Sequence, residues 1–572
     1  MEFPPVTIAK WRELVEKDLA GKSFDQALVH EAMEGIRISP LYTGVPPGDA
    51  APRALPQSRF QICMRHAGLV DLAALLADVR DGADALWLEL ASTPSALFER
   101  PELLSTFLIF DVDGAAPEPA LERIAGLVSV AAPRRFALSC DPIARRAQGR
   151  ASFAELPAEL SSLGRAGRLA AERFDGATAA LVSTLAYHEA GADAAEELAI
   201  ALATGACYLG ALLEAGLAPE RAAQQIALQP AVGRDTFVEL CKLRAMRLCW
   251  RKVLAASGAA GAGAARVHAV CSRRTLTVRD PWVNMLRATT QVFAAVLGGA
   301  DLITPSAFDE LLGAPSALGR RVARNIGLVL REESLLGQVG DPAGGSYYFE
   351  SLTDALARKA WARFQRIEQQ GGISAVLQSG ELAAQLKSGR EKQLDRIARR
   401  RVPILGVSEF ANLGETLPPR AEPLRTVSEP PGAALVATRD AAAFEQLRAR
   451  SEAAAPPLEA LLITLGSYSE SRPRADFARG FFAAGGLRTR ESRTDEKARL
   501  ACLCGSDERY ADEAAARARA LKAAGCSRVL LAGRPGASEA ALRAAGVDGF
   551  IFLGCDAVAT LTELLAPLEL PS

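Results

Sequence analysis

The sequence predicts an α/β protein with two parallel sheets, and two observations carry that prediction. From residue 60 onward, short β-branched or aromatic runs alternate with Ala/Leu/Arg-rich helical stretches, a pattern typical of strands that pair in parallel. Eight such units favour a closed (β/α)8 barrel of the TIM type. After a proline-rich break, five further strand–helix units are typical of a smaller, flavodoxin-like doubly wound sheet.

Composition limits the class of protein. The 572 residues are 49 % hydrophobic and 23 % charged, so large buried cores are expected. Lys and Arg number 66 against 67 Asp and Glu, and aromatic residues make up 6 %, which disfavours a nucleic-acid partner. We find no apolar run of membrane-spanning length and no signal-peptide pattern. Ten cysteines without a CxxC pair are typical of reduced thiols, so a cytoplasmic location is expected.

Residues 1–56 are expected to form an N-terminal helix and an irregular arm. The stretch from Ser39 to Pro56 is rich in Pro and Gly, which predicts extended chain. The arm either clasps a partner subunit or packs as an ordinary first helix on its own domain. The apolar residues that share one face of the helix are Ile8, Trp11, Leu14, Val15 and Leu19, with Gly21 as the stop signal.

The barrel is expected over residues 57–400. Helical stretches such as Leu69–Arg80, Pro117–Ser129 and Ala192–Ala215 separate its strands. The predicted strands are Phe60–His66, Ala85–Leu90, Phe107–Val112, Arg135–Cys140, Thr178–Ala186, Arg266–Ser272, Asp301–Thr304 and Gly337–Gly340.

The rest of the chain is expected to hold a linker and a second domain. Six prolines within residues 402–433 exclude regular structure, so residues 401–455 are interpreted as a linker that ends in a helix, Ala441–Ala455. Ligands of doubly wound sheets bind beyond the carboxyl ends of the strands, which makes the loop Ser467–Pro473, before a helix at Arg474–Ala484, the expected site. The strands predicted within 456–572 are Ala460–Gly466, Leu487–Arg490, Leu500–Gly505, Arg528–Ala532 and Gly549–Leu553.

Several motifs occur in an order that resembles one family. The chain is similar to the methylmalonyl-CoA mutases over almost its whole length, and its opening GIRISPLYTG (Gly35–Gly44) is most similar to the small (β) subunit of heterodimeric members. The barrel and linker motifs are EAGAD (Glu189–Asp193), RDPWVNMLRATTQVFAAVLGG (Arg279–Gly299), AFDE (Ala307–Glu310), RVARN (Arg321–Asn325), EES (Glu332–Ser334), DPAGGSYY (Asp341–Tyr348) and PILGVSEF (Pro403–Phe410).

The resemblance implies a radical carbon-skeleton rearrangement between methylmalonyl-CoA and succinyl-CoA. In this family adenosylcobalamin lies between the barrel and the second domain, and the acyl-CoA is threaded through the barrel. The cofactor carries the reaction, while the protein binds, orients and excludes water. A D-x-H-x-x-G motif after the first strand of the second domain supplies the cobalt-binding His.

This chain departs from that motif at each position. In TLGSYSESRP, Thr464 takes the place of the family's Lys, Tyr468 of the Asp, Glu470 of the His and Pro473 of the closing Gly. Carboxylate oxygens suit low-spin cobalt poorly, and proline fixes φ. The four histidines are His30, His66, His188 and His268, so none beyond residue 268 could substitute. We therefore predict that this chain binds no cobalamin and no metal, and we expect adenosylcobalamin in a partner subunit.

Two other signatures of the second domain are also replaced. CLCGSD (Cys502–Asp507) replaces the family's second signature, and AGRPG (Ala532–Gly536) replaces its glycine pair at the end of the next strand. AGRPG is interpreted as a plain β–α turn rather than a phosphate cradle, because its proline removes one backbone donor.

The barrel is altered in the same way. Leu185 and Ala186 stand where the family has a Tyr and a His over the corrin and the substrate. Tyr187 and His188 follow two positions later, and on a strand such a shift keeps the face but moves each group by about 6–7 Å. His188 is either restored to the site by a local realignment or, the preferred interpretation, caps or packs near the strand end. Further family residues are replaced by Arg274, Asp301, Thr304 and Gly327.

The residues that remain from the family pattern are explained by turns, caps and buried pairs: Arg287, Asp309, Glu310, Arg324, Asn325, Glu333, Asp341, Gly344 and Gly345. No catalytic residue is therefore predicted. The leading hypothesis is a non-catalytic small (β) subunit that forms a heterodimer with a catalytic large (α) subunit. The alternatives are an active cobalamin-dependent acyl-CoA mutase with an atypical cofactor site, a cobalamin- or CoA-responsive regulator, and a TIM-barrel enzyme of another kind.

Overall fold

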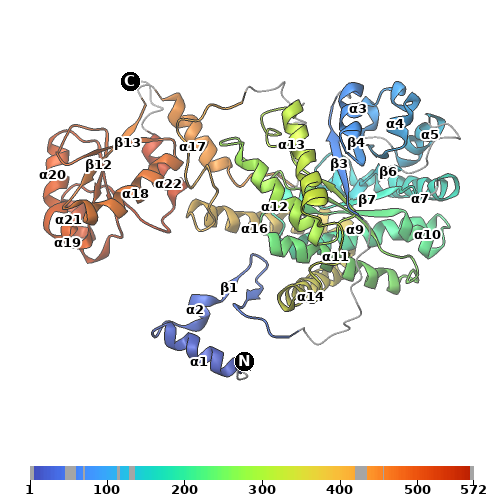
Figure 1. Ribbon diagram of the computed structural model, residues 1–572, viewed down its shortest axis with the longest axis horizontal. Coiled ribbons are helices and arrows are strands. Elements are labelled where there is room, and N and C mark those ends of the chain that lie inside the picture. The colour runs from blue at the N-terminus through green and yellow to red at the C-terminus, as the bar shows by residue number, and fades with distance from the viewer. Residues whose placement is uncertain are drawn as a thin grey trace.

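The computed structural model describes residues 6–44, 59–68, 71–112, 116–127, 136–174, 176–418, 435–454 and 457–566. Figure 1 shows an N-terminal arm, a barrel and a second sheet domain, which α17 (Ala442–Ala453) joins to the barrel.

Eight parallel strands form the barrel, and the sequence predicted seven of them. A bridge between Ala137 and Thr178 joins the two ends of the strand order, so the TIM-type prediction is confirmed. In order around the barrel, the strands are β6 (Phe136–Ser139), β5 (Phe107–Asp111), β4 (Ala85–Glu89), β3 (Gln61–His66), β11 (Leu302–Thr304), β10 (Arg266–Cys271), β8 (Ile226–Gln229) and β7 (Ala180–Ser183).

Two predictions in the barrel are wrong. Residues 337–340 form turns and bends, and the strand that the sequence missed is β8, which β9 (Ala231–Val232) continues beyond Pro230. Proline donates no N–H to a sheet, so Pro230 between β8 and β9 makes this part of the sequence look like a loop rather than a strand. The predicted strand Thr178–Ala186 ends at Ser183, and a helix, α8 (Leu185–Glu189), begins two residues later.

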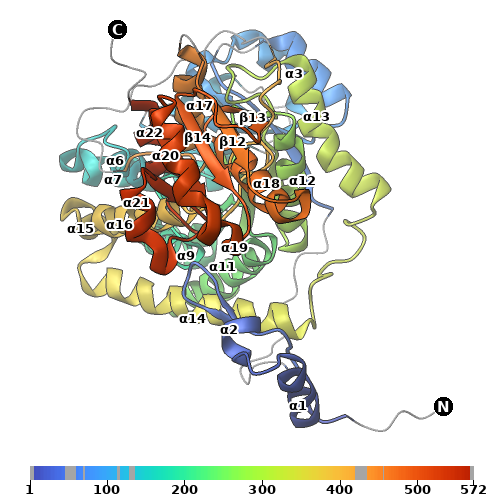
Figure 2. The same ribbon diagram turned by 90° about the vertical axis from the view of Figure 1, so that its left-hand side faces the viewer.

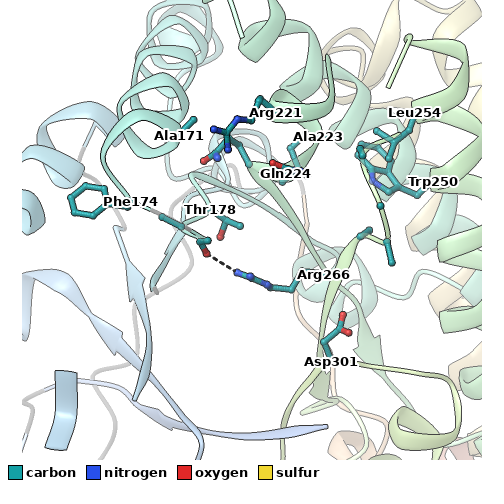
Figure 3. Close-up of a pocket in the computed structure, with 18 residues that line it drawn as sticks. Ala171, Phe174, Thr178, Arg221, Ala223, Gln224, Trp250, Leu254, Arg266 and Asp301 are labelled. Atoms are coloured by element: carbon teal, nitrogen blue, oxygen red, sulfur yellow. Dashed lines mark hydrogen bonds between the residues drawn. The ribbon is translucent and has the colours of Figure 1, made fainter. Parts of the chain in front are cut away.

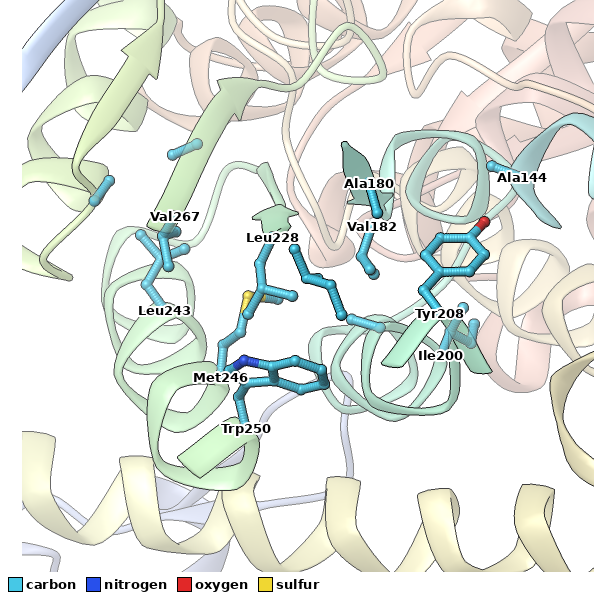
Figure 4. Close-up of a cluster of buried hydrophobic side chains, with 14 of the residues drawn as sticks. Ala144, Ala180, Val182, Ile200, Tyr208, Leu228, Leu243, Met246, Trp250 and Val267 are labelled. Carbon is cyan, nitrogen blue, oxygen red and sulfur yellow. The ribbon is translucent and has the colours of Figure 1, made fainter. Parts of the chain in front are cut away.

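Helices cover the outside of the barrel. Figure 4 shows Ile200 and Tyr208 of α9 and Met246 and Trp250 of α11 in the core beside strands β7 and β8. The two helices approach closely at Gly205, where a Cβ would lie 2.5 Å from the Trp250 ring. The main helices are α3 (Leu72–Arg80), α4 (Pro101–Leu104), α5 (Pro117–Leu127), α6 (Pro142–Ala147), α7 (Leu156–Arg173), α9 (Ala194–Glu214), α10 (Pro219–Gln224), α11 (Thr236–Ala256), α12 (Val283–Leu297), α13 (Ala317–Leu328), α14 (Tyr347–Gln369), α15 (Gly372–Gln378) and α16 (Glu381–Ala398).

Helix α9 is long and apolar enough to cross a membrane, which corrects the expectation that no such run exists. Within the described residues it is the one helix that passes this test, and 78 % of its apolar window is buried inside the protein. A core helix enclosed by neighbours on several sides has the same composition as a membrane span.

The N-terminal arm contains α1 (Ile8–Asp18), α2 (Phe24–Leu28) and a small antiparallel pair, β1 (His30–Glu31) and β2 (Arg37–Ile38). The predicted helix is confirmed, but none of its side chains is buried. Figures 1 and 2 show α1 projecting away from the barrel, so it does not pack on its own domain. The predicted extended segment is irregular up to residue 44, and its remainder lies outside the described residues.

The second sheet has the strand order β13–β12–β14–β15–β16, all parallel, which confirms the flavodoxin-like prediction. Apolar side chains form a core on each face of this sheet. The strands are β12 (Glu459–Thr464), β13 (Arg488–Ser492), β14 (Leu500–Cys504), β15 (Arg528–Ala532) and β16 (Gly549–Ile551). The helices are α18 (Tyr468–Ala484), α19 (Asp507–Arg509), α20 (Ala515–Ala523), α21 (Glu539–Ala544) and α22 (Ala557–Leu565).

Buried polar contacts fix α17 between the two domains. Glu445 accepts the backbone N–H of Val278 at 2.6 Å, and Arg448 pairs with Glu415 at 2.9 Å although its side chain is only 1 % exposed. Residues 402–418 form no helix or ladder strand, as predicted, and 419–434 lie outside the described residues.

Candidate functional site

The segment after β12 was predicted to be a loop, and the structure corrects that prediction. Ser467 instead precedes the first turn of α18, which begins at Tyr468 and includes Pro473. The backbone N–H and the hydroxyl of Ser467 both donate to Glu470 Oε2, at 2.7 and 2.5 Å. This is the helix-capping use of a Ser and a Glu three residues apart.

Glu470 is also paired across the sheet edge. Arg509 Nε donates to its second oxygen at 2.9 Å, so both carboxylate oxygens are engaged. The hydrogen bonds from Ser467, followed by that from Arg509, lower the pKa of Glu470 to about 2. At neutral pH Glu470 is therefore an ionised carboxylate that caps a helix.

The other two predicted positions beside this segment are peripheral. Thr464 ends β12 and donates to the Ser492 carbonyl at 3.3 Å. Tyr468 is 64 % exposed, and the Arg472 guanidinium lies 5.5 Å from its ring centroid. The contacts of Thr464 and Tyr468 give no indication that either residue binds a ligand.

Neighbouring strand ends are filled by this chain's own side chains. The Tyr510 hydroxyl accepts the Gly505 N–H at 2.9 Å and donates to the Ala532 carbonyl at 2.7 Å, so it bridges the ends of β14 and β15. Arg474 donates to the same carbonyl at 2.6 Å and lies so close to Gly533 that a Cβ there would be 2.2 Å from its Nη1. The AGRPG segment thus acts as a turn that holds an arginine.

In the barrel, Leu185, Ala186 and His188 lie on helix α8, so the argument from a shift along a strand is wrong. His188 is 1 % exposed. Burial lowers its pKa, so the ring is neutral; it donates through Nδ1 to Glu197 at 2.7 Å and accepts from Ser272 Oγ at 2.7 Å through Nε2.

A buried lysine completes this network. Lys242 lies 3.1 Å from Glu197 and 2.6 Å from Glu239, and its side chain is fully buried. Burial opposes ionisation of Glu197, but the charge of Lys242 and the hydrogen bonds donated by His188 and Thr184 outweigh it and hold the pKa of Glu197 at about 2. His188 is therefore a packed core residue, the preferred sequence interpretation.

The barrel lumen contains a layer of side chains that the sequence did not predict. Alternate strand residues, such as Cys63 and Trp87, form an apolar cluster separate from the helix-facing core. The Arg65 guanidinium lies 4.4 Å from the Trp87 ring centroid, and the His268 ring meets the indole edge-on at 5.5 Å. Burial, then Arg65, lowers the pKa of His268 to about 3.

Hydrogen bonds extend this layer to further strands. His268 Nε2 and Thr304 Oγ1 are 2.7 Å apart, and its Nδ1 lies 3.1 Å from Gln229 Nε2. Gln229 in turn accepts from the Ser183 hydroxyl at 2.8 Å. With Ile109 and Ala137 in the same cluster, every one of the eight barrel strands contributes to the cross-section.

A cavity of about 480 Å³ lies at the amino-terminal ends of strands β8, β10 and β11 (Figure 3). Arg221, Arg266 and Asp301 supply charge to its wall, and Arg266 donates to the Gly176 carbonyl at 3.4 Å. Within the described part of the chain, Thr178 Oγ1 and Gln225 Oε1 are buried in this wall without a hydrogen-bond partner. No sequence motif pointed to this cavity.

Of the family residues that remain, Arg324, Asp341 and Arg287 make contacts that hold the scaffold together, as interpreted from the sequence. Arg324 pairs with the buried Asp78 at 2.5 Å, and Asp341 pairs with Arg244. Arg287 donates to the Leu405 carbonyl at 2.7 Å and so ties the linker to α12. Over the residues that the structure describes, no group of three His, Cys, Asp or Glu side chains could hold a metal ion.

Comparisons with known proteins assign the family. A sequence model described as methylmalonyl-CoA mutase matches residues 140–464. The chain is 39 % identical to the methylmalonyl-CoA mutase small subunit of Streptomyces virginiae, over 99 % of this chain and 97 % of that one. It is 36 % identical to the small subunit of Propionibacterium freudenreichii subsp. shermanii, over 75 % and 68 %.

The match to a relative named simply methylmalonyl-CoA mutase is shorter. The Escherichia coli protein is 34 % identical over 40 % of this chain and 33 % of its own length. The small-subunit matches and the family model together cover the barrel and the second sheet, and this chain belongs to the methylmalonyl-CoA mutase family.

Proposed function

We propose that this chain is the small (β) subunit of an adenosylcobalamin-dependent methylmalonyl-CoA mutase, an isomerase, and that it is itself non-catalytic. It supports a cytoplasmic, catalytic large (α) subunit that holds the cofactor. The observation that carries the proposal is Glu470: the residue at the position of the family's cobalt ligand caps helix α18 and pairs with Arg509.

The residues at this edge do not fit cobalamin. A cobalt ligand needs a free imidazole nitrogen, and the sequence has no histidine beyond His268. Tyr510 and Arg474 occupy the neighbouring strand ends, and α18 begins where a ligand loop is needed. We therefore assign no reaction step to this chain.

The barrel supports the same assignment. His188, the histidine nearest the altered Tyr–His pair, is engaged on both ring nitrogens inside the core. Leu185 and Ala186 offer no proton donor or acceptor in their side chains. His188 is buried inside the chain, away from any substrate, and Leu185 and Ala186 carry no group that could take part in catalysis.

The partner follows from the relatives and from the arm. Proteins 36–39 % identical over most of this chain are named small subunits, a name that implies a large one. Three exposed apolar side chains, Val6 just before α1 (64 % exposed) and Ile8 and Leu14 within it (56 % and 53 %), offer surface for such a partner.

The first test titrates the purified chain with adenosylcobalamin, with the catalytic large subunit as a parallel positive control. We expect no change in visible absorbance and no retention in equilibrium dialysis. Tight stoichiometric binding would favour the alternative of an active mutase with an atypical site.

The second test mixes the chain with its large subunit on a sizing column with light scattering, where a stable heterodimer is expected and its absence contradicts the proposal. Leu14→Glu on the exposed face of α1 should weaken that heterodimer. Glu13→Lys, on the side of the helix opposite Ile8 and Val15, is the matched control and should leave the heterodimer intact, because it changes a charge without altering the apolar face.

A further inference from the structure

We propose that the cavity at the amino-terminal ends of the barrel strands binds a small organic acid that carries a hydroxyl group on an apolar body. The cavity, shown in Figure 3, has a volume of about 480 Å³. Small-molecule sites in proteins typically measure roughly 300–1,000 Å³. The described residues that line the cavity all come from the barrel, so this site does not depend on the proposed function.

The cavity lies on the helix side of the barrel wall. Trp250 and Leu254 of α11 line it, and both belong to the helix-facing core. Of the residues that the structure describes, none that lines the cavity belongs to the lumen cluster around Trp87. Arg266 lies between the two, because it lines the cavity while its guanidinium is 5.1 Å from the ring centroid of Phe107, which packs against that cluster.

Arg221 supplies the positive charge that an acid requires. It lines the cavity and forms no ion pair within the part of the chain that the structure describes. The carboxylate of Asp301, in the same wall, is already paired with Arg247 at 2.8 Å and accepts the Val267 N–H at 2.7 Å. Because a guanidinium binds a carboxylate through two parallel hydrogen bonds, Arg221 offers an organic acid a partner that the chain itself leaves unused.

Two buried polar side chains in the wall call for a hydrogen-bond donor on the ligand. Thr178 is 3 % exposed and Gln225 is 4 % exposed, and the hydroxyl of the one and Oε1 of the other have no partner among the described residues. Such atoms are rare unless water or a ligand meets them. An amide oxygen only accepts, so a ligand that meets Gln225 must donate, as a hydroxyl group does. Figure 3 shows Thr178 between the side chains of Arg221 and Arg266, so one small molecule can reach both kinds of partner.

Much of the remaining wall is apolar. Phe174 and Trp250 supply aromatic surface, and Ile226 and Leu254 supply aliphatic surface. In small-molecule sites such a wall buries the body of the ligand, while a few polar groups orient it. An inorganic anion would leave this apolar surface without a partner, so the wall favours an organic acid over phosphate.

The test measures binding of three probes to the full chain by isothermal titration calorimetry. 4-Hydroxybenzoate has the charge, the hydroxyl group and an apolar ring, benzoate lacks the hydroxyl group, and 4-hydroxybenzamide lacks the charge. We expect equimolar binding of 4-hydroxybenzoate at millimolar concentration. Loss of the hydroxyl group should raise the Kd about threefold to tenfold, and loss of the charge at least about fivefold.

Variants of the wall test the assigned residues. Arg221→Gln and Thr178→Val should each raise the Kd of 4-hydroxybenzoate at least about threefold. Because the Thr178 hydroxyl has no partner to lose in the described chain, Thr178→Val should not lower the free energy of unfolding without ligand, measured in urea. Gln225→Met removes the acceptor and provides a second measurement if the valine variant does not fold.

Arg251→Gln and Thr204→Val are the matched controls and should bind 4-hydroxybenzoate as the natural chain does. Arg251 is an exposed arginine of α11, and Thr204 of α9 has a buried hydroxyl without a partner in the described residues, but neither lines the cavity.

Three results would overturn the proposal: no binding of 4-hydroxybenzoate, the same Kd for all three probes, or the same Kd in the wall variants as in the controls. Displacement of 4-hydroxybenzoate by coenzyme A would also overturn it, because the cavity would then belong to a path for that larger molecule. Heterodimer formation, measured on the same variants, reports on the proposed function separately.

Discussion

The carboxyl ends of the barrel strands and those of the second sheet are both filled by the chain's own side chains, but in opposite environments. In the barrel, Glu197 is 1 % exposed and bound to His188 and Lys242. In the second sheet, Glu470 is 32 % exposed and bound to Ser467 and Arg509.

Burial decides how firmly each arrangement is fixed. A buried charge that loses its partner cannot turn to water, whereas an exposed one can. Substitutions in the barrel network are therefore costly to the stability of the fold. The edge of the second sheet is the region that a few substitutions could remodel.

The largest effect is expected when the barrel network is broken. Lys242→Met leaves Glu197 and Glu239 without their cation in the core, and we expect a loss of about 3–5 kcal/mol in the free energy of unfolding, measured in urea. Lys242→Arg keeps the charge and should lose less. If Glu197→Gln added to Lys242→Met destabilised the chain further, instead of restoring part of the loss, the contrast with the second sheet would be broken.

A smaller effect is expected where the arm meets the barrel. Glu34 accepts the Ala194 N–H at 3.2 Å at the start of α9 and is 6 % exposed. Burial, followed by Asp193, raises the pKa of Glu34 to about 7. Because the folded state holds the proton more tightly, the attachment of the arm is strongest below the ordinary pKa of glutamate and weakens as pH rises to 7.

The rise in the pKa of Glu34 from 4.5 to about 7 corresponds to at most about 3–4 kcal/mol of stability, lost as the pH rises through that interval. The charged groups around Glu34 are Asp193, which Arg363 pairs, and Glu239. Protection factors for hydrogen exchange of residues 24–38, which remove the intrinsic pH dependence of amide exchange, should be larger at pH 5 than at pH 8, and Glu34→Gln should abolish this difference. A difference that persisted in the glutamine variant would assign the titration to another group.

The smallest effect is expected at the second sheet. Glu470→Ala removes the capping contact and the Arg509 pair, and it should lower the melting temperature by less than Lys242→Met does. Arg472→Ala, on the same helix but paired with Asp476, is the control for loss of a surface charge. A decrease in melting temperature for Glu470→Ala as large as that for Lys242→Met would show that the difference in solvent exposure does not make the second sheet easier to alter than the barrel.

Local patterns predicted most of the fold. Seven barrel strands and all five strands of the second sheet were recognised because β-branched runs between helices mark buried parallel strands. Pro230 concealed β8, and Leu185–Glu189 continued an apolar run into what is a helix. The domain boundaries stay predictions.

The candidate site was less accessible to sequence reasoning. The absence of histidine from the second domain was visible, but the role of Glu470 depends on Arg509, 39 residues away. The partners of His188 include Ser272, 84 residues away, and the lumen layer gathers single residues from separate strands. Such contacts depend on the register of the barrel strands, because a shift of one residue turns every side chain of a strand to the opposite face.

The cap on α18 has a consequence for how the subunit is made. The first turn of this helix is completed by the chain's own Ser467 and Glu470. On the proposed function, the second domain folds without the cofactor, and we expect the amount of this subunit in the cell to follow its rate of synthesis rather than the supply of a vitamin.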